Sequence, residues 1–177
     1  VTLVPQNTAV GFPISVFDIV SMGRNPHRGR FEGMKQKDRE IIEQALQQTT
    51  IYELRDRNIN ELSGGEGQLA IIARALATEA SLILLDEPTA ELDIKHTLAI
   101  MHILFELRAQ GKTILVTVHD LNLARKFCDT ISIIHRGKIF YTGSPAEAFS
   151  PENIKQVFDV QVREFKNAST TFLDFYA

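Results

Sequence analysis

The stretch Leu82-Ile83-Leu84-Leu85-Asp86-Glu87-Pro88 places two acids directly after four apolar residues. A short apolar run of this kind predicts a strand covered on both faces, as in a parallel sheet between helices. In open α/β sheets ligands lie beyond the carboxyl ends of the strands, so Asp86 and Glu87 stand where a site is expected. The first acid could hold Mg²⁺, and the second could polarise an attacking water. The alternative is that the acids merely end the strand.

Helices and strands alternate on both sides of this stretch. Apolar spacing predicts helices at about 16–22, 35–49, 63–76 and 94–109, and strands at 1–4, 113–118, 130–135 and 139–142. Arg136-Gly137-Lys138 predicts a hairpin turn, while Ser144-Pro145 and Ser150-Pro151 predict helix starts. No secondary structure is predicted after Val162. The alternation indicates an α/β fold with a mostly parallel sheet.

Composition narrows the class of protein. The 177 residues are 44% apolar and 23% charged with a net charge of −3, which is typical of a soluble globular domain and indicates no nucleic-acid surface. The single Cys128 excludes an internal disulfide, and no Cys–His cluster has metal-ligand spacing. Every apolar run is far shorter than the roughly 18 residues of a membrane-spanning helix.

A second candidate site is Ser63-Gly64-Gly65 at the start of a helix. The N–H groups and the positive end of a helix attract anions, and glycines allow a phosphate to approach closely. Ser63 and Glu66 also have the spacing of a capping box, which explains the same residues by helix stability alone. Both interpretations remain open from the residues themselves.

Two weaker candidates follow other strands. His119 ends the strand expected at 113–118 and could donate a hydrogen bond to a terminal phosphate. Gln6 follows the first strand, where its amide could contact a metal ion and water. A lone histidine is more often structural, Asp120 could simply cap the next helix, and Gln6 could be an ordinary surface residue.

Gly111-Lys112-Thr113 imitates the end of a phosphate-binding loop, G-x-x-x-x-G-K-[ST]. The pattern requires glycine where Glu106 stands, and the expected helix precedes these residues instead of following them. The 177 residues therefore contain no phosphate-binding loop. The chain also begins at Val1 without methionine, inside an expected strand, so we expect that the loop belongs to a missing N-terminal segment.

Together these motifs resemble the ATPases of ABC transporters. Five segments match in the order of that family, and the match runs from Val1 to about Val162: Gln6 as the Q-loop, Leu62–Glu66 as the signature motif, Leu82–Glu87 as the Walker B strand with the catalytic glutamate, Ala90–Asp93 as the D-loop, and His119 as the switch histidine. The resemblance implies a P-loop NTPase-like fold, a mostly parallel sheet with helices on both faces. Its catalytic core would comprise residues 1–13 and 78–162, with a helical signature subdomain at about 14–77 and a C-terminal tail at 163–177.

The resemblance also implies a mechanism that uses ATP and Mg²⁺. Asp86 and Gln6 would hold the metal, Glu87 would activate water, and His119 would contact the γ-phosphate. Two such domains would pair head to tail as a homodimer. The nucleotide-binding set facing the partner would be Ser63, Gly64, Gly65, Glu66 and Asp93. The region after Gln6 would contact the integral membrane permease subunits.

Phe12-Pro13, the run from Ser21 to His27, and the segments around Tyr141 and Pro151 resemble the branch that imports iron–siderophore, haem or cobalamin. This predicts an ATP-hydrolysing import subunit at the cytoplasmic face of the inner membrane. Two alternatives remain: a soluble ABC protein of translation or DNA repair, and a non-catalytic remnant. Gly67 and Ala90 depart from the family's usual larger polar residue and serine. Without the phosphate-binding loop, we expect the isolated chain to be inactive.

Overall fold

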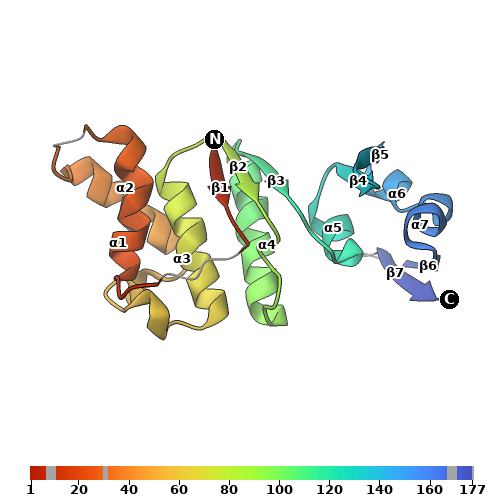
Figure 1. Ribbon diagram of the computed structural model, residues 1–177, viewed down its shortest axis with the longest axis horizontal. Coiled ribbons are helices and arrows are strands. Elements are labelled where there is room, and N and C mark those ends of the chain that lie inside the picture. Colours follow the sequence, from red (N-terminus) through yellow and green to blue (C-terminus); the bar gives the residue numbers. More distant parts are fainter. Residues whose placement is uncertain (7–10, 30–31, 167–170, 177) are drawn as a thin grey trace. The chain divides into compact units, whose positions relative to one another are not determined.

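A computed structural model describes residues 1–6, 11–29, 32–166 and 171–176 of the chain (Figure 1). The chain divides into two compact units, Val1–Thr117 and Val118–Ala177. Each unit is described by itself below. Residues 7–10, where the expected contact with the permease begins, lie outside the described residues.

The first unit is built on a three-stranded parallel sheet. Strands β1 (Thr2–Val4), β2 (Leu82–Leu85) and β3 (Thr113–Val116) lie in the order β1-β2-β3. Val4, Leu85 and Val116 are level with one another in the register, so the three carboxyl ends meet at one edge. The predicted parallel sheet is confirmed, and its strands end where the candidate residues begin.

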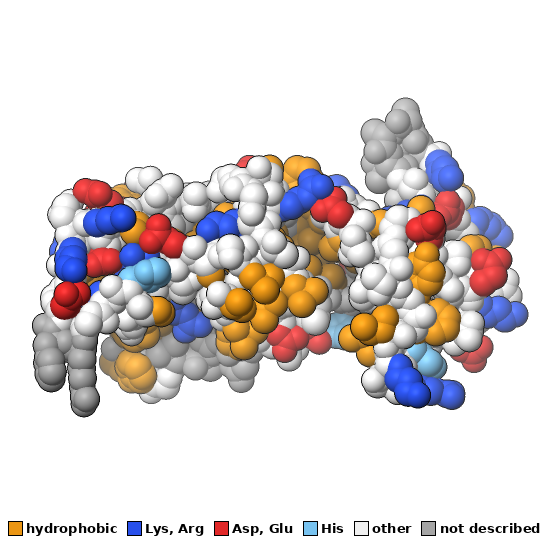
Figure 2. Space-filling view, turned by 90° about the horizontal axis from the view of Figure 1, so that it is seen from above, with side chains coloured by type: hydrophobic (Ala, Val, Ile, Leu, Met, Phe, Trp, Pro, Cys, Tyr) orange, Lys and Arg blue, Asp and Glu red, His pale blue; other side chains and the backbone are white. Residues whose placement is uncertain are grey.

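The two faces of this sheet differ. Val4, Ile83 and Leu85 are buried, whereas Leu3 and Leu115 are 57% and 62% exposed. The apolar residues at 113–118 therefore form a strand that is covered on one face only, because successive side chains of a strand point to opposite sides and only one side meets the core. Hydrophobic side chains also gather near the middle of the view in Figure 2.

Helices make up the rest of the first unit. They are α1 (Val16–Ser21), η1 (Met22–His27), α2 (Gln36–Gln48), η2 (Tyr52–Leu54), η3 (Ile59–Glu61), α3 (Gly64–Ala77) and α4 (Ile94–Ala109). The predicted helices of this region are confirmed. The chain leaves α4 through Gly111, whose φ of 87° is a left-handed conformation that glycine adopts without strain. Figure 1 shows α1, α2 and α3 side by side.

A buried arginine ties three of these helices together. The Arg24 guanidinium in η1 donates to Asp38 Oδ1 of α2 at 2.9 Å, and to the carbonyl of Ala77 and Glu79 Oε2 at 2.8 Å each. Arg24 and Asp38 are 4% and 6% exposed. A charge so deeply buried needs a charged partner, so this cluster fixes the C-terminal end of α3 against η1 and α2.

The second unit begins with α5 (Leu121–Phe127) and a hairpin of β4 (Ile131–His135) and β5 (Lys138–Gly143). Its turn has φ angles of 50° at Arg136 and 73° at Gly137, as a two-residue hairpin turn requires. Helices α6 (Pro145–Ala148) and α7 (Pro151–Phe158) follow, capped by Ser144 and Ser150. The predicted hairpin and both helix starts are confirmed.

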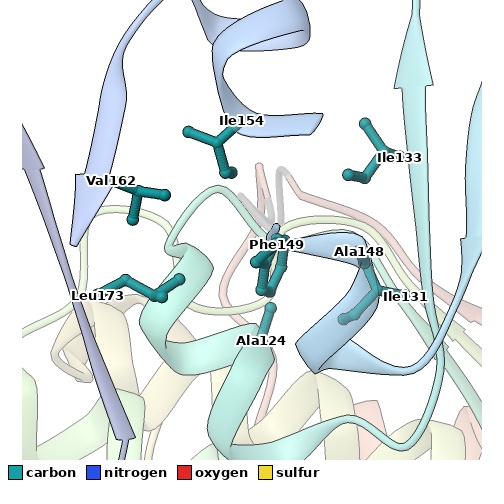
Figure 3. Packing of buried hydrophobic residues seen from close by; sticks show 8 residues of the cluster. All are labelled: Ala124, Ile131, Ile133, Ala148, Phe149, Ile154, Val162 and Leu173. Carbon is teal, nitrogen blue, oxygen red and sulfur yellow. The ribbon is translucent and has the colours of Figure 1, made fainter. Parts of the chain in front are cut away.

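The chain closes with an unpredicted second hairpin, β6 (Gln161–Lys166) and β7 (Thr171–Tyr176). Figure 3 shows its Val162 and Leu173 converging on Phe149 and Ile154 in the core of this unit. Asn122 of α5 anchors the hairpin through two hydrogen bonds. Its amide donates to the carbonyl of Leu173 at 3.0 Å, and its side-chain oxygen accepts from the Leu173 N–H at 2.7 Å.

Candidate functional site

The carboxyl ends of β1 and β2 bring together three residues singled out in the sequence. Gln6 follows β1 by two residues, and its side-chain amide donates to Glu87 Oε2 at 2.8 Å. Asp86 directly follows β2, and its backbone N–H donates to the carbonyl of Val4 at 2.9 Å. Gln6, Asp86 and Glu87 therefore form one cluster at the edge of the sheet, as the parallel topology requires.

Thr117 joins this cluster, and the sequence reasoning missed it. Its Oγ1 accepts the backbone N–H of Glu87 at 2.8 Å and donates to Asp86 Oδ1 at 2.9 Å. A hydroxyl residue near the carboxyl end of the strand predicted at 113–118 was the signal that could have found it. One hydroxyl thus sets the position of both acids.

The backbone of Glu87 is unusual. Its φ of 45° lies in the left-handed region, where a non-glycine residue costs about 1–3 kcal/mol. The bond from its N–H to Thr117 and the bond from Ala90 N to its carbonyl, at 3.1 Å, hold this conformation. Such conformations cluster at functional sites because the surrounding structure must enforce them.

The donor set of this cluster fits Mg²⁺. It offers two carboxylates, an amide oxygen and a hydroxyl, and hard oxygen ligands are those that Mg²⁺ prefers. Within the described ranges, no group of three or more His, Cys, Asp or Glu residues could form a complete metal cage. Mg²⁺ in nucleotide sites is usually held by one or two carboxylates plus phosphates and water, so the absence of a complete cage within the described residues does not conflict with such a site at Asp86 and its neighbours.

The helix start at Ser63 contains the capping box. Ser63 Oγ accepts from the N–H of Glu66 at 3.3 Å, and Glu66 Oε2 accepts from the N–H of Ser63 at 2.8 Å. The N–H and then the hydroxyl of Ser63 lower the pKa of the Glu66 carboxyl. Ser63 and Gly64 remain exposed at the start of α3. The cap uses the Glu66 carboxylate, yet the exposed first turn still presents N–H groups that lack intrahelical partners.

Three other positions complete the comparison with the sequence. Asp93 caps α4, where its side chain accepts the N–H of His96. His119 belongs to the second unit and precedes Asp120, the N-cap of α5, so the structural role expected for Asp120 is confirmed. An added Cβ at Gly67 would meet no atom within 4 Å. No close neighbour therefore requires a glycine at this position, where the family usually has a larger polar residue.

The imitation of a phosphate-binding loop is excluded by its surroundings. Gly111 follows α4 and Thr113 begins β3, which is the reverse of the required order. Lys112 Nζ donates to the carbonyls of Glu79 and Ala80 at 3.3 and 2.9 Å. Lys112 therefore holds the turn that follows α3.

Comparison with known protein families identifies the chain. A family model described as ABC transporter matches residues 1–90, just over half of the sequence. The chain belongs to the ABC transporter family. This ABC transporter match includes Gln6, the segment from Ser63 to Glu66, and both acids after β2.

Relatives of this ABC transporter chain are named as ATP-binding proteins of import or transport systems. The chain is 40% identical over 159 residues to the iron(3+)-hydroxamate import ATP-binding protein FhuC of Bacillus subtilis, covering 89% of the chain and 59% of that protein. The manganese transport system ATP-binding protein MntA of Synechocystis is 41% identical over 157 residues, with 88% and 60% coverage. The cobalamin import ATP-binding protein BtuD of Halobacterium salinarum is 34% identical over 163 residues, with 92% and 40% coverage. The chain thus spans only 40 to 60% of their lengths.

Solved structures confirm the fold class. A metal-chelate type ABC transporter in an inward-facing conformation matches with a TM-score of 0.90 and 31% identity, over 98% of this chain and 70% of that one. The protein cbiO1 from Clostridium perfringens, part of the ABC transporter complex cbiONQ, matches with a TM-score of 0.74 and 29% identity, over 88% and 61%. The ABC ATPase fold and the resemblance to the importer branch are therefore established.

Proposed function

We propose that this chain forms part of the ATP-binding and ATP-hydrolysing subunit of an importer that takes up a metal chelate of the iron–siderophore, haem or cobalamin type. The observation that carries the proposal is the cluster of Gln6, Asp86 and Glu87, joined by Thr117 at the carboxyl edge of the sheet. The names of the relatives support the class of cargo. Another relative is named for manganese transport, so the names agree on metals or metal-containing cargo.

Each residue of the cluster has a distinct proposed role. Asp86 and Gln6 would hold Mg²⁺, which when bound would supply positive charge to the β- and γ-phosphates. Glu87 orients the attacking water, with the Gln6 amide keeping its carboxylate in place.

His119 contacts the γ-phosphate. The exposed Ser63 and Gly64, with Gly65, Glu66 and Asp93, serve the nucleotide held by a second copy.

The proposed assembly has two copies paired head to tail and bound to permease subunits through the region after Gln6. The chain is then a peripheral protein of the cytoplasmic face of the inner membrane. None of the helices in the described ranges combines the length and apolar character needed to span a bilayer. Charges of both signs are interspersed on the face in Figure 2. We retain the division into a core (1–13, 78–162), a signature subdomain (14–77) and a tail (163–177).

These 177 residues alone lack a phosphate-binding loop. The loop's lysine and N–H groups cradle the β- and γ-phosphates in this class of enzyme. The isolated chain is therefore expected to hydrolyse ATP negligibly. A rise of several degrees in its melting temperature with millimolar ATP would contradict that expectation.

The decisive experiment uses the protein expressed from its complete reading frame, beside Glu87→Gln. We expect the wild-type protein to hydrolyse ATP and the variant to bind ATP with little hydrolysis. The amide of glutamine has nearly the same shape as the carboxylate of glutamate, but it cannot activate water as a carboxylate does. ATP should also drive the variant into dimers, measured by light scattering after size-exclusion chromatography. Glu106→Gln, at an exposed position on α4, is the matched control and should keep wild-type turnover.

A folded wild-type protein that neither binds nor hydrolyses ATP would refute the proposal in favour of a non-catalytic remnant. Purification from membranes tests the transport assignment separately. Co-purification with an integral membrane subunit supports the importer, and co-purification with ribosomes supports the soluble ABC alternative.

A further inference from the structure

The ring of His96 is fixed by Asp93 at the start of α4. Asp93 Oδ1 accepts the backbone N–H of His96 at 2.8 Å, which caps the helix. Nδ1 of the same histidine lies 3.0 Å from Oδ1 and 2.9 Å from Oδ2 of Asp93. An ionised carboxylate only accepts, so Nδ1 is the donor. The backbone bond, followed by the side-chain bond, lowers the pKa of Asp93. The backbone N–H and the ring Nδ1 of His96 thus both bind the Asp93 carboxylate.

The other side of that ring lies against Gly65 in the first turn of α3. A Cβ added at Gly65 would overlap Cγ and Cδ2 of the ring and would lie 2.8 Å from His96 Cβ. The neighbouring glycines differ: a Cβ at Gly64 would come no nearer than 3.9 Å to Leu92, and one at Gly67 would meet nothing within 4 Å. Gly65 is buried, whereas Gly64 is exposed. Gly65 therefore makes room for His96, and Gly64 remains open to a ligand.

We propose that His96 is a positioning residue that holds the signature segment Ser63–Glu66 in a fixed place relative to Asp93. This inference rests on the proposed function, in which both segments serve the nucleotide held by a second copy. The ring is bonded to one segment and packed on the other, so a shift of either moves its neighbour. Displacing a binding group by about 1 Å can cost a factor of about 100 in rate, so a rigid link between the segments matters for turnover.

Three substitutions in the protein expressed from its complete reading frame test the link. His96→Ala removes the ring and its bond, His96→Phe keeps a ring beside Gly65 but loses the bond to Asp93, and His102→Ala alters an exposed histidine of the same helix as a control. We expect His96→Ala to lower kcat about tenfold or more, with the Kd of the separate subunit for ATP changed by about twofold at most. His96→Phe should lie between it and the wild type, and the control should match the wild type.

A double-substitution cycle with Gly65→Ala tests the contact without relying on ATP hydrolysis. In the protein with His96, the added methyl group meets the ring and should lower the melting temperature. In the His96→Ala protein the overlap with the ring atoms is gone and only the contact with Cβ at 2.8 Å remains, so the same change should lower it less. Equal losses in both backgrounds, or a His96→Ala protein with wild-type kcat, would overturn the inference. Absence of ATP hydrolysis in the wild type would instead reject the proposed function, with the melting cycle still reporting on the contact.

Discussion

Thr117 shows how much of the candidate site depends on one hydroxyl. It accepts from the backbone of Glu87 and donates to the carboxylate of Asp86, so the residue proposed to activate water and the residue proposed to hold metal share one anchor. The hydrogen bond from the Glu87 N–H to Thr117 also stabilises the left-handed backbone conformation of Glu87, which glycine would adopt without strain but glutamate does not. The proposed roles of Asp86 and Glu87 therefore depend on positions that Thr117 helps to fix.

We expect Thr117→Val to impair turnover far more than stability. Valine has the same shape but neither donates nor accepts, so Asp86 and Glu87 lose their common anchor. Because Thr117 is exposed, water can replace its bonds, and the free energy of unfolding should fall by about 1 kcal/mol or less. Steady-state ATP hydrolysis and urea unfolding of the protein from its complete reading frame check this. Thr117→Ser restores the hydroxyl and should recover turnover; valine and serine variants of equal activity would contradict the role.

At the scale of elements, the buried Arg24 cluster joins η1, α2 and the end of α3. The hydrogen bond from the Arg24 side chain, followed by the backbone N–H of Lys35, lowers the pKa of the Asp38 carboxyl. Helix α3 begins at the proposed signature segment and ends at this cluster, since Arg24 also binds the carbonyl of Ala77. The ion pair therefore supports the element that presents Ser63 and Gly64.

This cluster predicts a pH dependence of stability. A carboxyl whose pKa is lower in the folded state stabilises the protein above its unfolded pKa of about 3.9, and that contribution is lost as the pH falls through the folded pKa. The melting temperature of the wild-type protein should exceed that of Asp38→Asn near neutral pH, and the gap should narrow below about pH 4. Circular dichroism melts from neutral to acidic pH measure the gap. Curves that stay parallel throughout would show that Asp38 does not carry this linkage.

At the scale of the whole molecule, the chain forms two units, and each has its own means of joining distant segments. In the first, three strands far apart in sequence form the sheet edge that carries the acids. In the second, Asn122 binds the backbone of Leu173, 51 residues later, and fixes the C-terminal hairpin against α5. Asn122 lies only three residues after His119, so the hairpin supports the segment that carries the proposed switch histidine.

Replacing Asn122 should loosen the hairpin and leave the rest of the second unit folded. In Asn122→Ala the backbone N–H of Leu173 loses its acceptor, and we expect its amide to exchange with solvent faster. Asn122→Asp keeps an acceptor for that N–H but cannot donate to the Leu173 carbonyl, so its effect should be smaller. Hydrogen exchange read at Leu173, with amides of β4 as the internal reference, measures both. Unchanged protection at Leu173 in the alanine variant would contradict the anchoring role.

The sequence by itself determined most of the elements before Val162 and three of the four residues clustered at the edge of the sheet. Strand β2, the capping box at Ser63, the end of α4 at Gly111 and the turn at Arg136 were all predictable, because each depends on residues close together in the chain. Gln6, Asp86 and Glu87 were predictable as neighbours because parallel strands bring their carboxyl ends to one edge.

Only the tertiary structure decided which side chains complete these features. Thr117 reaches Glu87 across 30 positions, and His96 fills the space beside Gly65 from a different helix. The β6–β7 hairpin lacks a clear alternation because few of its side chains meet the core, and Asn122 anchors it from a distance. Local spacing cannot encode such contacts, because whether two distant residues meet depends on how the intervening elements pack.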